Sequence, residues 1–283
     1  MPRAAGFEET LRRPSTDWNK MTASMRLAVA TRCLPPPLKS ALLLASRFGA
    51  AGVQLDARNE TKPSEMSETG RRQLKHLLDE VGLSLASLDF PLRKPLWDVE
   101  RLEARIQALK EAMEFAYQLK ARTVTVPLGG LPAESDAAGR SLLAGVLNDV
   151  ARHANRVGAT LAVGPGREPP EKVAEVLRGV TEGPIGVNFD PASAVSLPTS
   201  PADALGIWGD LVAHVLVRDA IREPDGGSGE VPLGRGEVPW VELLAILQER
   251  GYRGWFTVDR TRGEDRAGDA ERALAFLKEV YRG

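Results

Sequence analysis

Three short apolar runs in the last third of the chain each end in an aspartate. They span residues 186–190, 213–219 and 251–259 and end at Asp190, Asp219 and Asp259. Carboxylates at neighbouring strand ends are suited to hold a hard divalent cation or to move protons on a bound molecule. If the three runs are parallel strands, their carboxyl ends lie on one face and point into a common site. Asp219 supplies a third carboxylate unless the adjacent Arg218 neutralises it.

Arginines gather near the same predicted strand ends. A planar guanidinium group offers fixed charge and paired donors for phosphate or carboxylate. The glycines of 129–130 and 164–166 let backbone amides approach such a ligand. We hypothesise that the pocket binds an anionic metabolite such as a sugar phosphate or sugar acid. The alternative is that the arginines are solvated loop residues paired with the three aspartates. These arginines are Arg32, Arg167, Arg218, Arg235, Arg260 and Arg262.

The elements that position these residues alternate between strand and helix from residue 26 onward. Apolar residues at helical spacing, such as Leu102, Ile106 and Leu109, mark the intervening helices. About eight strand–helix units with nearly continuous apolar strands favour a closed (β/α)8 TIM barrel over an open sheet. No low-complexity linker follows residue 25, so residues 25–283 are expected to form one domain. The expected strands are 26–30, 52–55, 83–88, 123–126, 160–163, 185–189, 212–217 and 255–258.

Composition narrows the class of partner. Among 283 residues, 43% are hydrophobic and 27% charged, which is ordinary for a soluble globular protein. A formal net charge of −1 gives no footprint of nucleic-acid binding. No apolar run approaches the roughly 20 residues of a membrane span. The single cysteine, Cys33, excludes an internal disulfide and fits a cytoplasmic location. A small molecule is therefore the expected partner.

The first 24 residues differ from the rest of the chain. The segment is polar, has arginines at Arg3, Arg12 and Arg13, and lacks the apolar core of a signal peptide. It is interpreted either as a disordered tail, because it buries too little to offset its ordering entropy, or as a start codon assigned too early. In the second case translation begins at Met21 or Met25.

Five stretches in order along residues 26–283 resemble the xylose isomerase-like barrels, in particular the sugar phosphate isomerases and epimerases. The resemblance implies a xylose isomerase-like TIM barrel that acts on a small carbohydrate. The stretches are 48–55 (FGAAGVQL), 81–85 (VGLSL), 214–219 (HVLVRD), 233–240 (LGRGEVPW) and 251–255 (GYRGW).

The resemblance also implies a metal site with altered ligands. Members of the family hold a divalent cation, such as manganese, magnesium, cobalt or zinc, with two glutamates, an aspartate and a histidine. Only the aspartate is retained, as Asp190, while Asp259 replaces the last glutamate. The first glutamate falls at Gly164 and the histidine at Leu216, with His214 two residues earlier. The resemblance makes Asp190 and Asp259 the catalytic candidates, and those two with His214 the metal-ligand candidates.

Two functions remain open at this stage. The first is a sugar or sugar-phosphate isomerase or epimerase, with Arg167, Arg218, Asp219, Arg235 and Arg260 as substrate-binding candidates. The second is a metal-free barrel that binds a carbohydrate or anion and has lost catalysis, which the missing glutamate and histidine favour. No feature of the sequence specifically favours a purely structural role.

Overall fold

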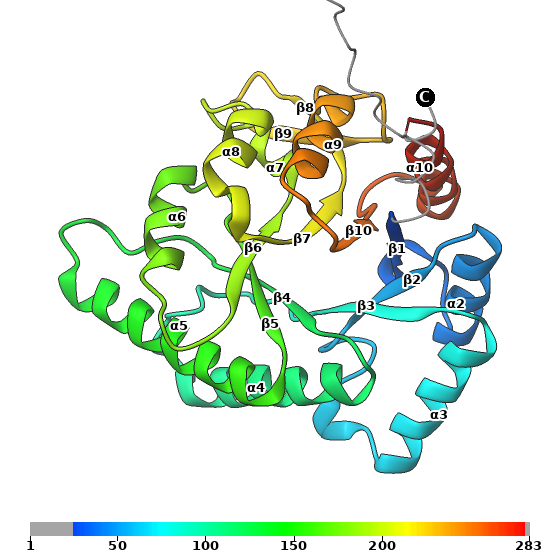
Figure 1. Ribbon diagram of the computed structural model, residues 1–283, viewed down its shortest axis with the longest axis horizontal. Helices are drawn as coiled ribbons and strands as arrows, with labels where there is room; N and C mark the ends of the chain where they lie inside the picture. The colour runs from blue at the N-terminus through cyan, green and yellow to red at the C-terminus, as the bar shows by residue number, and fades with distance from the viewer. Residues whose placement is uncertain (1–24, 281–283) are drawn as a thin grey trace, which may run out of the picture.

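Within residues 25–280, which the computed structural model describes, eight parallel strands close into a barrel. The ring closes where the first strand pairs with the last, through Arg26 opposite Trp255 (Figure 1). The expected TIM barrel is confirmed, and every expected strand boundary lies within one residue of the observed one. The strands are β1 (Arg26–Ala30), β2 (Gly52–Asp56), β3 (Ser84–Asp89), β4 (Thr123–Pro127), β5 (Thr160–Gly164), β6 (Ile185–Phe189), β7 (Val212–Val217) and β10 (Trp255–Val258). The interpretations of residues 1–24 lie outside the described residues.

Helices connect the strands and surround the barrel (Figure 1). They are α2 (Leu38–Arg47), α3 (Glu68–Glu80), α4 (Leu102–Gln118), α5 (Ala137–Val157), α6 (Pro170–Arg178), α7 (Pro191–Ala194), α8 (Pro201–Trp208), α9 (Trp240–Glu249) and α10 (Arg266–Val280), with 3-10 turns η1 (Thr31–Cys33), η2 (Pro63–Glu65) and η3 (Gly209–Leu211). Ser67, Asp136 and Ser200 begin α3, α5 and α8 by accepting hydrogen bonds from free amides of the first turn. None of the helices in the described residues has the length and apolar character needed to cross a membrane.

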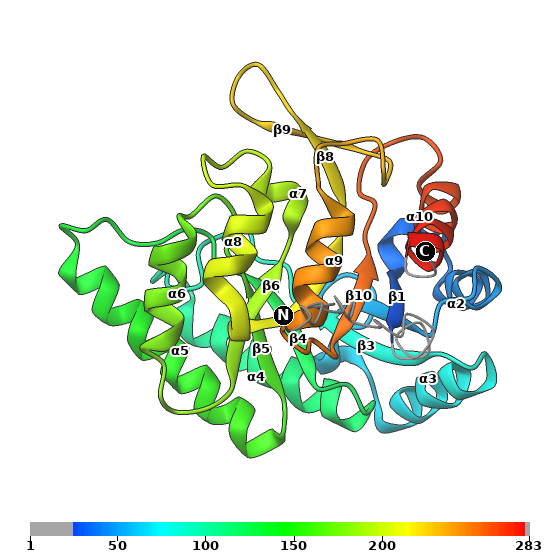
Figure 2. The same ribbon diagram turned by 45° about the horizontal axis from the view of Figure 1, so that its top comes forward.

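The connection between β7 and α9 contains an antiparallel hairpin that the sequence pattern does not predict. Its strands are β8 (Asp219–Arg222) and β9 (Ser228–Val231), and Figure 2 shows them projecting beyond the barrel. Asp219 is paired with Val231. Asp219 therefore starts a hairpin strand, whereas the sequence pattern placed it at the end of a barrel strand. The short helices α7 and α8 were not expected either.

An aromatic ring fills one end of the barrel interior. Trp255 packs against Ala28 and Ala86, which form a small buried cluster with it. A Cβ atom at Gly52 would lie 2.8 Å from the Trp255 ring, so glycine is required there for the ring to fit. Because β10 begins at Trp255, this ring lies at the amino ends of the strands.

Polar side chains fill the middle of the barrel. His214 is completely buried, with its Nδ1 atom 2.8 Å from Asn188 Oδ1 and its Nε2 atom 2.9 Å from Thr257 Oγ1. Ser87 Oγ lies 3.2 Å from the same Nε2 atom and accepts a hydrogen bond of 2.9 Å from Gln54. These bonds connect five strands across the axis, so the interior is held by directional contacts as well as by packing.

Candidate functional site

A cavity of about 270 Å3 lies at the carboxyl ends of the strands, where TIM-barrel active sites form. Part of its lining is apolar, from residues such as Leu92, Trp208 and Leu216. The polar lining residues come from the ends of β3 and β6 and from the segments after β1 and β6. They are Arg32, Asp89, Asn188, Asp190 and Ser193.

Arg32 joins two carboxylates at this end of the barrel. Its Nε atom donates to Asp259 Oδ1 at 2.8 Å, its Nη2 atom donates to Asp259 Oδ2, and its Nη1 atom donates to Asp89 Oδ2 at 2.8 Å. The Asp259 side chain is fully buried, while that of Arg32 is 34% exposed. Burial alone would lower the pKa of Arg32, but the hydrogen bonds and negative charge of Asp259 raise it above its ordinary value. Arg32 therefore stays charged and forms an ion pair with Asp259.

Asp89 is the carboxyl group of the cavity most suited to hold a proton. Burial raises its pKa, although the charge of Arg32 and a 2.8 Å hydrogen bond from Thr125 oppose the shift. A cavity carboxyl group with a raised pKa keeps its proton to a higher pH than an ordinary aspartate, which suits it to exchange a proton with a bound molecule. From the sequence alone, Asp89 is equally suited to line the cavity or to cap a loop. The structure places it in the lining of the cavity.

Asp190 is tied to the loops by several donors. Its Oδ1 atom accepts from the amide of Ala192 at 3.1 Å, which begins α7. Its Oδ2 atom accepts from Ser193 Oγ at 2.7 Å and from Arg218 Nη1 at 2.8 Å. The negative charge of Asp190 is the largest influence on Arg218 and raises its pKa. Asp190 thus lines the cavity as a paired carboxylate.

Glu230, on the unpredicted hairpin, extends this pairing away from the cavity. It accepts hydrogen bonds from Arg218 at 2.7 Å and from Arg260 at 2.8 Å, and Arg260 also donates to Asp269 at 2.9 Å. Burial favours the neutral acid, but hydrogen bonds from Thr261 and Arg218 lower the pKa of Glu230 to about 2. Sequence reasoning missed Glu230 because the predicted barrel had no element there. The only signal was a lone glutamate after a glycine-rich turn.

Asp219 does not line the cavity. Its carboxylate accepts from the backbone amides of Gly234 at 2.8 Å, Gly236 at 3.1 Å and Val238 at 3.2 Å. Such a set of amides holds a loop in place, and a Cβ atom at Gly236 would lie 2.1 Å from Asp219. The structure therefore places Asp190 in the cavity and Asp259 beneath Arg32, while Asp219 faces the loop before α9.

The remaining predicted arginines lie in different environments. Arg260 is almost buried within the Glu230 pairing. Arg167 and Arg235 are exposed, and Arg262 is exposed beside Glu230, to which its backbone amide donates. Arg32, Arg218 and Arg260 are paired with carboxylates, as the alternative interpretation of the arginines expected.

The observed donors do not fit a divalent cation. His214 lies in the middle of the barrel with both ring nitrogens hydrogen-bonded, and burial lowers its pKa to about 3. Gly164 and Leu216, which line the cavity where the family resemblance places ligands, have no ligating side chain. Asp190 and Asp259 are each bound to an arginine. Within residues 25–280, no three His, Cys, Asp or Glu side chains form a group able to hold a metal ion.

The chain belongs to the xylose isomerase-like TIM barrel family, whose model matches residues 42–280. No curated protein matches it. Among solved structures, a xylose isomerase domain protein from Planctomyces limnophilus is 22% identical with a TM-score of 0.80, covering 91% of this chain and 97% of that one. A xylose isomerase-like TIM barrel protein from Mycobacterium smegmatis in complex with magnesium is 17% identical with a TM-score of 0.77, covering 92% and 98%. D-allulose 3-epimerase from Methylomonas in complex with D-allulose is 17% identical with a TM-score of 0.73, covering 90% and 97%. At these identities the similarity supports the fold.

Proposed function

We propose that this barrel binds a small carbohydrate at the carboxyl ends of its strands without a divalent cation. The observation that carries the proposal is the contact of Arg32 with both Asp89 and Asp259. A cation at this position would need carboxylate oxygens that the guanidinium already occupies. The positive charge that such a cation would contribute comes from a side chain of the protein.

The lining of the cavity suits a neutral sugar better than an anion. Asn188 and Ser193 supply neutral polar groups, and the charge of Arg32 is offset by Asp89 and Asp259. Leu92 and Leu216 supply apolar surface for the C–H face of a sugar ring. A volume of about 270 Å3 lies just below the roughly 300 Å3 at which ligand pockets of drug size begin, which fits a monosaccharide.

Isomerisation or epimerisation is the second candidate, and the raised pKa of Asp89 favours it. Moving a proton between carbon atoms requires groups that accept and return it. Asp89 is suited to this role, and Asp190 is the other carboxylate in the cavity lining. In this reaction Arg32 would stabilise negative charge that develops on a sugar oxygen.

Titration of D-fructose and D-allulose into chelator-treated protein tests the first proposal. We expect saturable heat release with the chelator present, an unchanged Kd when magnesium or manganese is added, and a Kd at least fivefold weaker in Asp190→Asn. Asp210→Asn, a substitution at an exposed residue of η3, is the matched control and should leave the Kd for the sugar unchanged. Binding that appears only after a cation is added would contradict the proposal.

Proton exchange separates the two candidates. If the barrel is an isomerase or epimerase, incubation with a bound sugar in D2O should introduce deuterium at one ring or chain carbon, and Asp89→Asn should abolish this while leaving Kd within a few fold. If wild type binds the sugar, introduces no deuterium and forms no isomer or epimer, the protein is a binding protein for that sugar.

A further inference from the structure

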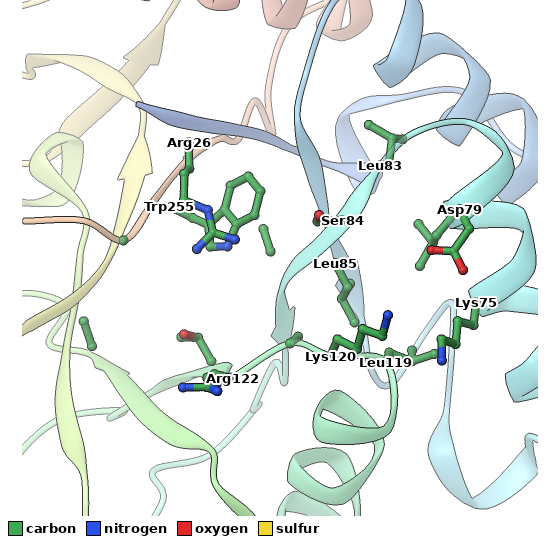
Figure 3. A pocket seen from close by; sticks show the side chains of 16 residues that line it. Arg26, Lys75, Asp79, Leu83, Ser84, Leu85, Leu119, Lys120, Arg122 and Trp255 are labelled. Carbon is green, nitrogen blue, oxygen red and sulfur yellow. The ribbon is translucent and has the colours of Figure 1, made fainter. Parts of the chain in front are cut away.

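A second cavity, of about 350 Å3, lies at the opposite end of the barrel from the candidate site. Its lining comes from the amino ends of β1, β3, β4 and β10 and from the carboxyl ends of α3 and α4 (Figure 3). This end of a TIM barrel normally serves stability, and its loops seldom carry the reaction. The chemistry of the side chains around this cavity indicates more than packing.

Positive charge dominates the rim of this cavity. Arg26, Lys75, Lys120 and Arg122 line it, against the single carboxylate of Asp79 (Figure 3). Among residues 25–280, none of these four cationic groups forms an ion pair with a carboxylate. Four like charges around a concave surface repel one another, and an anion bound among them would relieve that repulsion.

Helix ends account for only part of this arrangement. Lys120 follows the end of α4, so the partial negative charge of that helix end offsets some of its charge, whereas Lys75 lies more than one turn before the end of α3. Arg26 is the first residue of β1 and Arg122 immediately precedes β4, and strands offer no comparable dipole. Lys120 also has a left-handed backbone, with φ of 65°, at a position where glycine is usual.

Arg26 is fixed in a geometry suited to an oxyanion. Its guanidinium carbon lies 4.0 Å from the centroid of the Trp255 ring. Stacking of this kind orients the guanidinium plane and leaves its N–H edges free to donate to an oxyanion. Trp255 is itself held by the close approach of Gly52, so the platform is rigid.

We propose that this cavity is a binding site for the phosphate group of a small phosphorylated metabolite. Phosphate offers the negative charge and the several acceptor oxygens that the N–H groups of arginine and lysine bind. The cavity is larger than a phosphate group, and Leu78, Leu85 and Leu119 in its lining provide apolar contact for the organic part. The site is separate from the carbohydrate cavity, so each proposal stands or fails without the other.

Phosphorus NMR and tryptophan fluorescence test the site with inorganic phosphate and phenyl phosphate as probes, at constant ionic strength. We expect saturable binding of both, tighter for phenyl phosphate, with a change in fluorescence that is lost in Trp255→Phe. Equal affinity for the two probes would indicate free phosphate as the occupant. Absence of saturable binding of either probe would overturn the proposal.

Matched charge variants assign the binding to this cavity. Lys75→Gln with Arg122→Gln should weaken phosphate binding at least tenfold, while Asp79→Asn should tighten it several-fold. Lys39→Gln with Arg47→Gln removes the same charge from exposed positions on α2 and should change Kd less than twofold. Thermal unfolding of each variant verifies the fold. If the two double variants weaken phosphate binding equally, the effect comes from the overall charge of the protein, and the proposal is overturned.

Discussion

A single guanidinium, that of Arg32, contacts both carboxylates at one side of the candidate site. Its partner Asp259 is fully buried, and a buried carboxylate without a counter-charge is costly. Asp259 also lies 3.7 Å from the Sγ atom of Cys33, whose pKa is raised by burial and by that negative charge. Cys33 is therefore a buried, protonated thiol that packs beneath the site.

Replacing Arg32 by methionine should lower the free energy of unfolding by about 3 kcal/mol, because Asp259 would remain buried and unpaired. The same change in an Asp259→Asn background should cost about 2 kcal/mol less, since the buried charge of Asp259 is then absent and only Asp89 loses its partner. Urea denaturation of the four proteins in this cycle measures the coupling. Arg47→Met, at an exposed position on α2, should change stability by no more than about 0.5 kcal/mol. Independent, additive effects of Arg32→Met and Asp259→Asn would contradict the pairing.

At the level of elements, the barrel strands could be predicted and the hairpin β8–β9 could not. A barrel strand such as β6 is buried on both faces and reads as an apolar run ending at Asp190, so hydrophobicity alone reveals it. The hairpin strands are four residues long and only partly buried, and Ser228 to Val231 have no apolar alternation. The sequence therefore located Asp190 and Asp259 at strand ends but gave no sign that Glu230 would reach Arg218 and Arg260. The pairing of Arg32 with Asp259 also escaped prediction, because it joins residues 227 positions apart.

Glu230 ties the hairpin to Arg260 and Thr261 after β10, and this attachment should depend on pH. The folded-state pKa of about 2 lies below the ordinary 4.5, so the ionised group stabilises the fold above pH 4.5. That contribution, on the order of 3 kcal/mol, should be lost as the pH falls from 4.5 towards 2. Wild type and Glu230→Gln should therefore differ most in free energy of unfolding near pH 6 and converge towards pH 2.

Urea unfolding at a series of pH values measures this convergence. The exposed Glu103→Gln serves as the control and should track wild type throughout. A constant difference between wild type and Glu230→Gln from pH 6 to pH 2.5 would show that Glu230 acts through its shape and not its charge.

Across the whole molecule, the fold of the family is retained. The side chains at the carboxyl ends of the strands differ from the metal ligands that the resemblance implies. The polar middle layer around His214 and the apolar shell outside the strands hold the strand ends in position whatever side chains they carry. Fold and site are therefore separable, as expected for a barrel that hosts many reactions. The positions matched to missing ligands, Gly164 and Leu216, both still line the cavity.

This separability predicts that a metal site can be restored with few changes. A Cβ atom at Gly164 would meet nothing closer than 3.7 Å, so Gly164→Glu can be accommodated, and Leu216→His places an imidazole in the lining. Arg32→Met releases Asp259, so in the triple variant the new glutamate, the new histidine and Asp259 are available for one cation, while Asp190 remains paired with Arg218. We expect the triple variant to bind cobalt or manganese in a 1:1 ratio, measured by cobalt absorption and by metal analysis after dialysis.

The matched control is the double variant Gly164→Glu with Leu216→His, which keeps Arg32. It should bind the same metal at least tenfold more weakly. Stoichiometric metal in wild-type protein, or equal binding with and without Arg32, would mean that the guanidinium does not occupy the place of the ion.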